Sequence, residues 1–123
     1  MLNAAGIAGG LGVSGQTAGG SWEGFVIENL IAAAPAGAPV CFYRTAVGAE
    51  VDLVLEIGPK ERWAIEIKRS SAPSPSKGFY LGSTDVQASR RMVIHGGKET
   101  FGLGDGVEAL SLASAVKALR AAA

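Results

Sequence analysis

Two short runs of alternating polar and apolar residues carry the side chains that could do chemistry. Asp52 lies in the first run, Glu66 and Lys68 lie in the second, and a Gly-Pro-Lys segment at 58–60 separates them. Alternation with period two and many β-branched residues predicts two half-buried strands joined as a hairpin. The three polar side chains then share one face of neighbouring strands. They could bind a divalent cation there or form ordinary ion pairs.

The register of this hairpin separates the two possibilities. Only even offsets keep the apolar side chains together, and Val51 and Leu53 are expected on that apolar side. A three-residue loop places Asp52 opposite Glu66, whereas a shift by two pairs Asp52 with Lys68. Facing carboxylates repel by a few tenths to about 1 kcal/mol, which favours a shared proton or a bound cation. A solvated, charged sheet face is the alternative.

Length and charge limit the function classes. The 123 residues are enough for one domain with one core. Eleven basic and eleven acidic residues balance, so no global positive charge is available to hold nucleic acid. Residues 62–98 contain seven basic and two acidic residues. This segment predicts either a weak anion-binding surface or a solvated one.

Cysteine content and hydropathy indicate a cytoplasmic protein. Cys41 is the only cysteine, so no internal disulfide can form and a reducing compartment is expected. The longest apolar run is far shorter than the roughly 20 residues of a membrane-spanning helix. The first residues lack a basic segment, so we expect neither a signal peptide, an anchor nor a membrane partner.

The N-terminal segment differs in composition from the rest. Residues 1–20 are rich in Gly and Ala and carry no charge, which predicts a linker or arm before a single domain at 21–123. The Gly-rich run at 9–15 lacks the Gly-Lys-Ser/Thr ending of a phosphate-binding loop, and no strand precedes it. Nucleotide binding is therefore not expected.

The remaining pattern predicts a helix, three strands, a helix, a strand and a final helix. Ser21 is expected to cap the first helix, with Glu23 in its first turn, and Pro35 follows its end. A second helix is expected at 76–88 although Gly78 and Gly82 weaken it. Strands are expected at 40–45, 50–57, 62–68 and 90–95, with a brief strand at 107–110 and a final helix capped by Ser111.

Two other positions have alternative roles. Tyr43 and Arg44, at the end of the first strand, could contact a phosphate or simply lie at the sheet edge. His95, the only histidine, ends the fourth predicted strand. A lone histidine at such a position is expected to be structural rather than catalytic.

The order of elements and motifs resembles the restriction-endonuclease-like superfamily of PD-(D/E)XK nucleases. Its signature is an acid on the second strand and an acid-x-Lys triplet on the third, matched here by Asp52 and by residues 66–68. Residues 22–30, 43–45, 48–55 and 64–70 are similar to the C-terminal domain of unknown function found on many bacterial AAA-type ATPases. The resemblance covers roughly residues 20 to 120.

The resemblance implies a fold and an activity. The fold is α/β (α+β), with a restriction-endonuclease-like core whose mixed sheet has about four to five strands flanked by helices. The activity is Mg²⁺-dependent phosphodiester hydrolysis of DNA. Asp52 and Glu66 would bind the metal with help from the backbone carbonyl of Ile67, and Lys68 would orient the attacking water or neutralise charge. Glu23 would be the helix-borne acid of the site.

Phosphate contacts and partners follow from the same resemblance. Glu28 is the second choice for the helix-borne acid, and Arg69, Ser70 and Arg44 would contact phosphates. The family's P-loop ATPase is not encoded here, so we expect a stand-alone counterpart or a fragment. The alternative function is a catalytically inactive interaction or assembly module on the same scaffold, working as a homodimer or with a partner protein.

Overall fold

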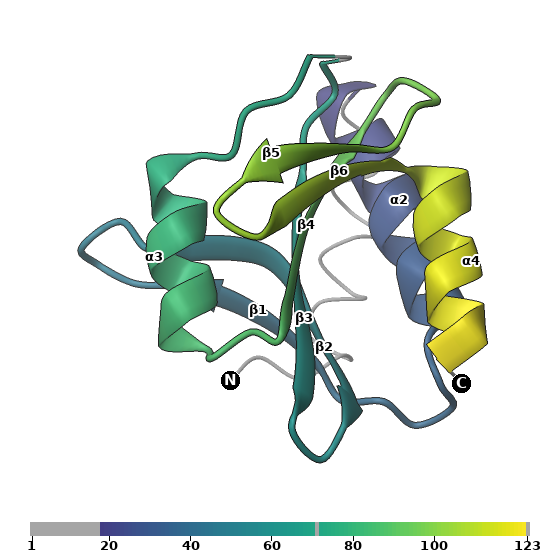
Figure 1. Ribbon diagram of the computed structural model, residues 1–123, viewed down its shortest axis with the longest axis horizontal. Coiled ribbons are helices and arrows are strands. Elements are labelled where there is room, and N and C mark those ends of the chain that lie inside the picture. The colour runs from purple at the N-terminus through teal and green to yellow at the C-terminus, as the bar shows by residue number, and fades with distance from the viewer. Residues whose placement is uncertain (1–17, 71, 123) are drawn as a thin grey trace.

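A mixed sheet of six strands separates two helices on one face from one helix on the other (Figure 1). The computed structural model describes residues 18–70 and 72–122. The helices are α2 (Ala18–Ala33), α3 (Lys77–Asp85) and α4 (Leu112–Ala122). The strands are β1 (Val40–Arg44), β2 (Glu50–Gly58), β3 (Glu61–Ile67), β4 (Arg90–His95), β5 (Phe101–Gly104) and β6 (Val107–Ser111).

The sheet combines an antiparallel half with a parallel centre. Its strand order is β1-β2-β3-β4-β6-β5. β1, β2 and β3 are antiparallel, β3, β4 and β6 are parallel, and β5 is antiparallel to β6. Parallel neighbours need a crossover, and α3 supplies it between β3 and β4. The carboxyl ends of β3, β4 and β6 therefore meet at one edge, where the first turns of α2 also lie (Figure 1).

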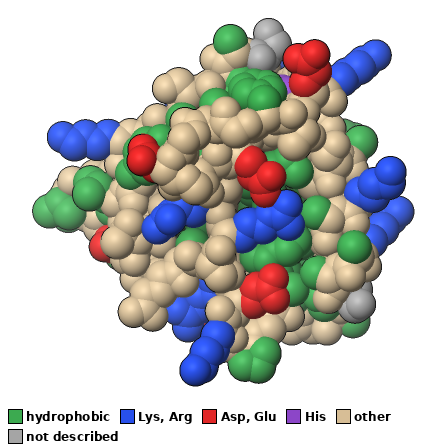
Figure 2. All heavy atoms as spheres, in the orientation of Figure 1, with side chains coloured by type: hydrophobic (Ala, Val, Ile, Leu, Met, Phe, Trp, Pro, Cys, Tyr) green, Lys and Arg blue, Asp and Glu red, His purple; other side chains and the backbone are tan. Residues whose placement is uncertain are grey.

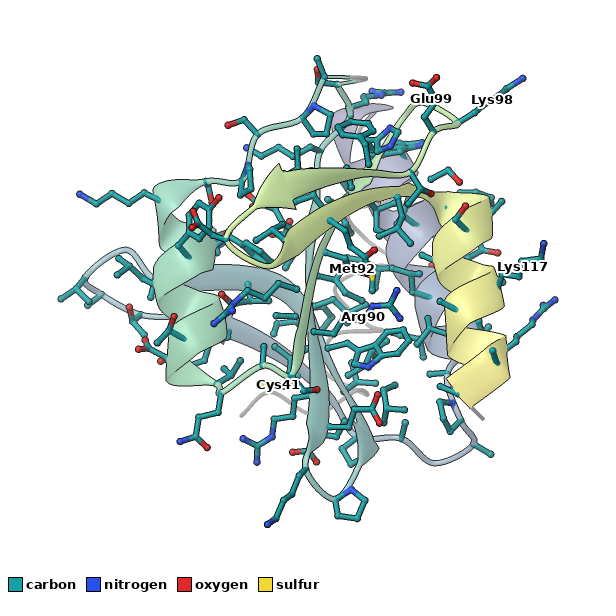
Figure 3. The ribbon with its side chains drawn as sticks, in the orientation of Figure 1. Cys41, Arg90, Met92, Lys98, Glu99 and Lys117 are labelled. Carbon is teal, nitrogen blue, oxygen red and sulfur yellow. The ribbon has the colours of Figure 1, made fainter. Side chains whose placement is uncertain are left out.

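Each face of the sheet has its own apolar core. α2 and α4 pack against each other and cover one face, and α3 covers the other. The core under α2 and α4 contains Val26, Leu30, Leu53, Leu55, Trp63, Ile65, Met92, Ile94 and Leu119, among others. The core under α3 contains Val51, Val54, Ala64, Phe79, Val93 and Val107. In Figure 3, Met92 points to the α4 side of β4, whereas Cys41 lies toward α3.

The α/β (α+β) class predicted from the sequence is confirmed. The sheet has six strands rather than four to five, because residues 101–111 form the antiparallel pair β5–β6. The sequence predicted only the second of these two strands. The final helix begins after Ser111, as predicted, and the Ser111 hydroxyl caps it by accepting the backbone N–H of Ser114 at 3.1 Å.

The start of the first helix was predicted wrongly. α2 begins at Ala18, so Ser21 lies inside the helix and no acidic residue occupies its first turn. Helix formation therefore includes residues 18–20 of the segment predicted as a linker. The rest of that prediction, together with the Gly-rich run at 9–15, lies outside the described residues. No helix in the described part of the chain is long and apolar enough to cross a membrane.

The two glycines that were expected to weaken α3 allow it to approach β2 closely. A Cβ atom on Gly78 would lie 2.5 Å from the backbone oxygen of Gly48. One on Gly82 would lie 2.7 Å from a methyl carbon of Val51. These two positions are one helical turn apart and face the sheet, so α3 sits against the beginning of β2. The helix ends at Asp85 and does not reach the predicted end at residue 88.

Candidate functional site

The β2–β3 hairpin has the register that directs Asp52 toward Glu66. Glu56 pairs with Arg62 in this ladder, and their side chains form an ion pair at 3.2 Å. The last pair at the other end joins Leu53 to Ile65. Of the two registers left open by the sequence, the structure therefore has the one with facing carboxylates rather than an Asp52–Lys68 pair.

A β-bulge places Asp52 at a break in strand alternation. The register between β1 and β2 shifts between Cys41 and Tyr43, so Asp52 and Leu53 lie opposite a single residue of β1. Val51 consequently joins the core under α3, whereas Leu53 belongs to the core under α2 and α4. The predicted placement of these two residues on one side is wrong. Such bulges re-aim side chains and are frequent next to functional sites.

The carboxylate of Asp52 takes the place of a backbone acceptor. Its Oδ2 accepts the backbone N–H of Ile67 at 2.8 Å. This hydrogen bond lies just beyond Leu53 and Ile65, the last pair of the ladder between β2 and β3. Asp52 is thereby fixed beside the acid-x-Lys triplet of β3.

Burial and neighbouring negative charge act on Asp52 together. Burial, as the main cause, raises the pKa of its carboxyl to about 6, against the opposing effect of the Ile67 N–H. The charges of Glu66, Glu50 and Glu23 raise this pKa further. Three other carboxylates therefore lie within electrostatic reach of Asp52. A cation placed among them would relieve this repulsion.

Glu66 is buried, and two neighbouring donors compensate the charge of its carboxylate. Its side chain, in a residue only 7% exposed, receives the backbone N–H of Ser76 on Oε2 at 3.1 Å. The Lys68 ammonium lies 3.6 Å from Oε1 of the same carboxylate. Lys68 therefore pairs with Glu66 and not with Asp52. Ser76 was not predicted as a site residue, although a helix-capping serine after the acid-x-Lys strand is a usable signal in the sequence.

Of the two acids on α2, Glu23 and not Glu28 lies within electrostatic reach of Asp52. Both side chains are exposed on α2, but only the charge of Glu23 contributes to the raised pKa of Asp52. The structure thus brings Glu23, Asp52, Glu66 and Lys68 to the same edge of the sheet. Glu50, which the sequence analysis did not single out, lies there as well.

The residues predicted to contact phosphates have protein partners. Arg44 forms an exposed ion pair with Glu50 at 2.9 Å. The guanidinium carbon of Arg69 lies 5.9 Å from the ring centroid of Trp22, in cation–π geometry. The hydroxyl of Ser70 accepts the backbone N–H of Ala72 at 3.1 Å. The structure brings Arg69 toward α2 and leaves Arg44 at the outer strand.

The basic segment 62–98 does not form one continuous positive surface. Arg62 pairs with Glu56, Lys68 with Glu66, and Arg90 with Glu108. The guanidinium of Arg90 also stacks over the Trp63 ring at 4.6 Å. Figure 2 shows basic side chains separated by neutral surface and acidic neighbours on the visible face. Of the two surfaces predicted for residues 62–98, anion-binding or solvated, the solvated one describes most of this segment.

His95 is structural, as predicted. It is buried, and its Nδ1 accepts the backbone N–H of Gly97 at 2.8 Å. Nε2 then carries the proton and donates to the backbone oxygen of Glu99 at 2.7 Å. Both ring nitrogens are occupied in holding the turn after β4, where Figure 3 shows Lys98 and Glu99 projecting outward.

The donor set defines the kind of metal chemistry available. Within residues 18–70 and 72–122, no group of three or more His, Cys, Asp or Glu side chains is arranged to hold a metal ion. The residues predicted to bind metal supply two carboxylates here, those of Asp52 and Glu66. Mg²⁺ is commonly bound by one or two carboxylates, with waters and phosphate oxygens completing its octahedron. Two carboxylates therefore fit the open coordination of Mg²⁺. They are too few for a closed structural metal site, which takes four protein ligands.

Fold and site together define a mixed-sheet α/β domain with an acid–acid–lysine group at the carboxyl ends of its parallel strands. The chain belongs to the family described as "Domain of unknown function (DUF4143)", whose model matches residues 18–115. Uncharacterised proteins of Mycobacterium bovis and Mycobacterium tuberculosis are each 40% identical to it over 92 residues. The match covers 75% of this chain but 20% of each relative. No solved structure matches the chain.

Proposed function

We propose that this domain is a PD-(D/E)XK nuclease-like module that hydrolyses phosphodiester bonds of DNA with Mg²⁺ at Asp52 and Glu66. One observation carries the proposal: Asp52 Oδ2 is bonded to the Ile67 N–H at 2.8 Å, which puts the β2 acid beside the Glu66-Ile67-Lys68 triplet. The match of these residues to the nuclease signature adds support.

The electrostatics of the site support a bound cation. The pKa of Asp52 is raised to about 6, so its charge is poorly compensated by the protein alone. Bound Mg²⁺ would supply charge neutralisation at the phosphate and lower the pKa of a coordinated water. Asp52 and Glu66 would hold it through carboxylate oxygens.

The other residues have separable roles in this proposal. Lys68, on the same edge of the sheet, orients the attacking water or stabilises negative charge on the phosphate oxygens. Because its side chain is 39% exposed, Lys68 can turn from Glu66 toward a substrate. Glu23 adds a carboxylate from α2, and Arg69 and Ser70 lie next to the triplet for phosphate contacts. Arg44 would serve only if it left Glu50.

Metal titration tests the proposal directly. Mn²⁺ and Mg²⁺ are titrated into the wild type and into Asp52→Asn, and nicking of plasmid and branched DNA is then measured. We expect saturable metal binding and divalent-dependent nicking in the wild type, with both lost in Asp52→Asn. Absence of binding at millimolar metal in the wild type would refute the nuclease function.

A second candidate function is an inactive interaction or assembly module. Two large apolar side chains are exposed, Phe25 at 58% and Val47 at 86%, and each is available to contact a partner. The relatives are also about five times longer than the matched segment, so the domain has further polypeptide to contact in them. This candidate predicts self-association or partner binding that survives Asp52→Asn.

Both candidates are proposed for the cytoplasm, in keeping with the unpaired Cys41. Burial, as its main cause, raises the pKa of the Cys41 thiol, which keeps it in the unreactive protonated form. For partners we propose DNA, a second copy or another protein, and neither a nucleotide nor a membrane.

A further inference from the structure

The Glu66 carboxylate receives a hydrogen bond from an element that follows it by ten residues. The backbone N–H of Ser76 donates to Glu66 Oε2 at 3.1 Å. The other oxygen of this carboxylate faces the Lys68 ammonium at 3.6 Å. Lys68 has a long, half-exposed side chain, whereas the Ser76 donor is part of the backbone. The direction of Oε2 is therefore set by the position of Ser76.

Ser76 is itself fixed by the start of α3. Its hydroxyl caps the helix by accepting the backbone N–H of Phe79 at 3.1 Å. Phe79 is fully buried in the core under α3. The preceding segment contains Pro73 and Pro75, which restrict the backbone that leads from β3 to this point. The donor is thus held from both sides.

The same helix is in contact with the strand that carries Asp52. Gly78 lets α3 lie against the backbone oxygen of Gly48, and Gly82 lets it lie against Val51. α3 therefore holds Glu66 on β3 through its N-terminus and touches β2 next to Asp52 through its glycines. The two carboxylates come from paired strands, and α3 with its cap contacts each of these strands.

We propose that Ser76 is a positioning residue whose backbone N–H fixes the Glu66 carboxylate for cation binding. This inference rests on the proposed function for its consequence, which is metal affinity. Donors to ligating carboxylates, when removed, typically lower metal affinity 10- to 100-fold.

A pair of variants at Ser76 separates its two hydrogen bonds. Ser76→Ala removes the hydroxyl cap but keeps the N–H to Glu66. Ser76→Pro removes both, and proline fits here because Ser76 has φ −75°. We expect Mn²⁺ affinity within about threefold of wild type for Ser76→Ala, and about tenfold or more weaker for Ser76→Pro. Equal Mn²⁺ affinity of the two folded variants would overturn the inference.

A spectroscopic measurement tests the contact without metal and without proline. Each carboxylate has its own backbone donor: Ser76 N–H for Glu66 and Ile67 N–H for Asp52. We expect Glu66→Gln to move the amide proton resonance of Ser76 upfield with a smaller effect on Ile67. Asp52→Asn, the matched control, should do the reverse. A Ser76 resonance unchanged in Glu66→Gln would overturn the positioning role.

Failure of the proposed function is distinguishable from failure of this inference. A wild type that binds no Mn²⁺ refutes the metal site, and the amide resonances then decide alone whether Ser76 holds Glu66. A wild type that binds Mn²⁺ while Ser76→Pro binds it equally well refutes the positioning role and leaves the nuclease proposal standing.

Discussion

Asp52 and Glu66 are neighbouring carboxylates with different electrostatic environments. Glu66 is buried between a lysine ammonium and a backbone N–H. Asp52 has one backbone donor and three acidic neighbours, and its pKa is raised to about 6 mainly by burial. At neutral pH the protein therefore carries an ionised Asp52 at a cost in stability. Such a cost is common where a site is arranged for a ligand.

The first prediction concerns stability against pH. The pKa of Asp52 is about 6 in the folded protein and roughly 3.9 in an unfolded chain, so the folded state binds more protons between these values. The free energy of unfolding should therefore fall as pH rises through this window, by at most about 3 kcal/mol, and stay lower above it. Urea unfolding of the wild type and of Asp52→Asn, from about pH 4 to about pH 7, measures this contribution.

The variant is the control for other titrating groups. In Asp52→Asn the new side chain keeps an oxygen that can accept the Ile67 N–H but has no charge to bury. We expect the two proteins to be equally stable near the low end of the range, and Asp52→Asn to be the more stable one near neutrality. A stability difference that does not change with pH would contradict the raised pKa.

The second prediction concerns His95. His95→Ala leaves the Gly97 N–H and the Glu99 oxygen without their ring partner and removes the contact with the Phe101 ring, whose centroid lies 5.4 Å away. We expect a loss of about 2–4 kcal/mol in the free energy of unfolding. Mn²⁺ affinity should not change. Lys98→Ala, in the same turn but exposed, should stay within about 0.5 kcal/mol of wild type; loss of Mn²⁺ binding in a stable His95→Ala protein would instead make His95 part of the site.

At the level of elements, the sequence predicted the features that depend on residues close together in the chain. Period-two alternation limited the β2–β3 register to even offsets, which left two arrangements of Asp52 relative to the 66–68 triplet. The structure has one of these two. The bulge at Asp52 was not predicted, because it arises from pairing with β1 and from packing under α3. An alternation pattern contains no information about which neighbour a strand will meet.

α3 shows the same limit for helices. Its glycines lower intrinsic helix propensity, so the sequence alone gave them only a negative role. In the fold they permit contact with β2 at distances that a Cβ would prevent. The start of α2 illustrates the opposite case, since Gly19 and Gly20 have weak helix propensity and are nevertheless helical.

The third prediction tests this close approach. Gly78→Ala gains about 1 kcal/mol of helix propensity, but its Cβ would lie 2.5 Å from the Gly48 backbone oxygen. We expect a net loss of about 1–3 kcal/mol in the free energy of unfolding. Gly102→Ala in β5 is the control, because nothing lies within 4 Å of its Cβ position. A Gly78→Ala protein as stable as wild type would show that α3 can move away from β2 without cost.

At the level of the whole molecule, the distribution of charge does not favour nucleic-acid binding by electrostatic attraction alone. The chain has equal numbers of basic and acidic residues. Arg62 and Arg90, which the sequence counted toward a basic footprint, are used in ion pairs far along the strands from the site. Pairing of side chains from different strands cannot be counted from composition, which is why the basic segment predicted more positive surface than the fold presents.

The last prediction follows from this distribution. DNA approaching Asp52 meets four carboxylates, those of Asp52, Glu66, Glu50 and Glu23. Two basic side chains pair with them, Lys68 with Glu66 and Arg44 with Glu50. Without a divalent cation we therefore expect DNA affinity no better than the roughly 10⁻⁴ M end of non-specific binding. Added Mn²⁺ should produce saturable binding in fluorescence anisotropy, because it neutralises the carboxylates and bridges to phosphate.

The salt dependence of that binding assigns the phosphate contacts. At fixed Mn²⁺, Arg69→Ala should reduce the slope of log K against log salt by about 1, whereas Arg90→Ala should leave it unchanged because Arg90 is paired with Glu108. Binding that is equally strong in the presence of a chelator would mean that DNA is held elsewhere on the molecule. The carboxylate pair would then have no part in binding, and the interaction-module function would be the better account of this domain.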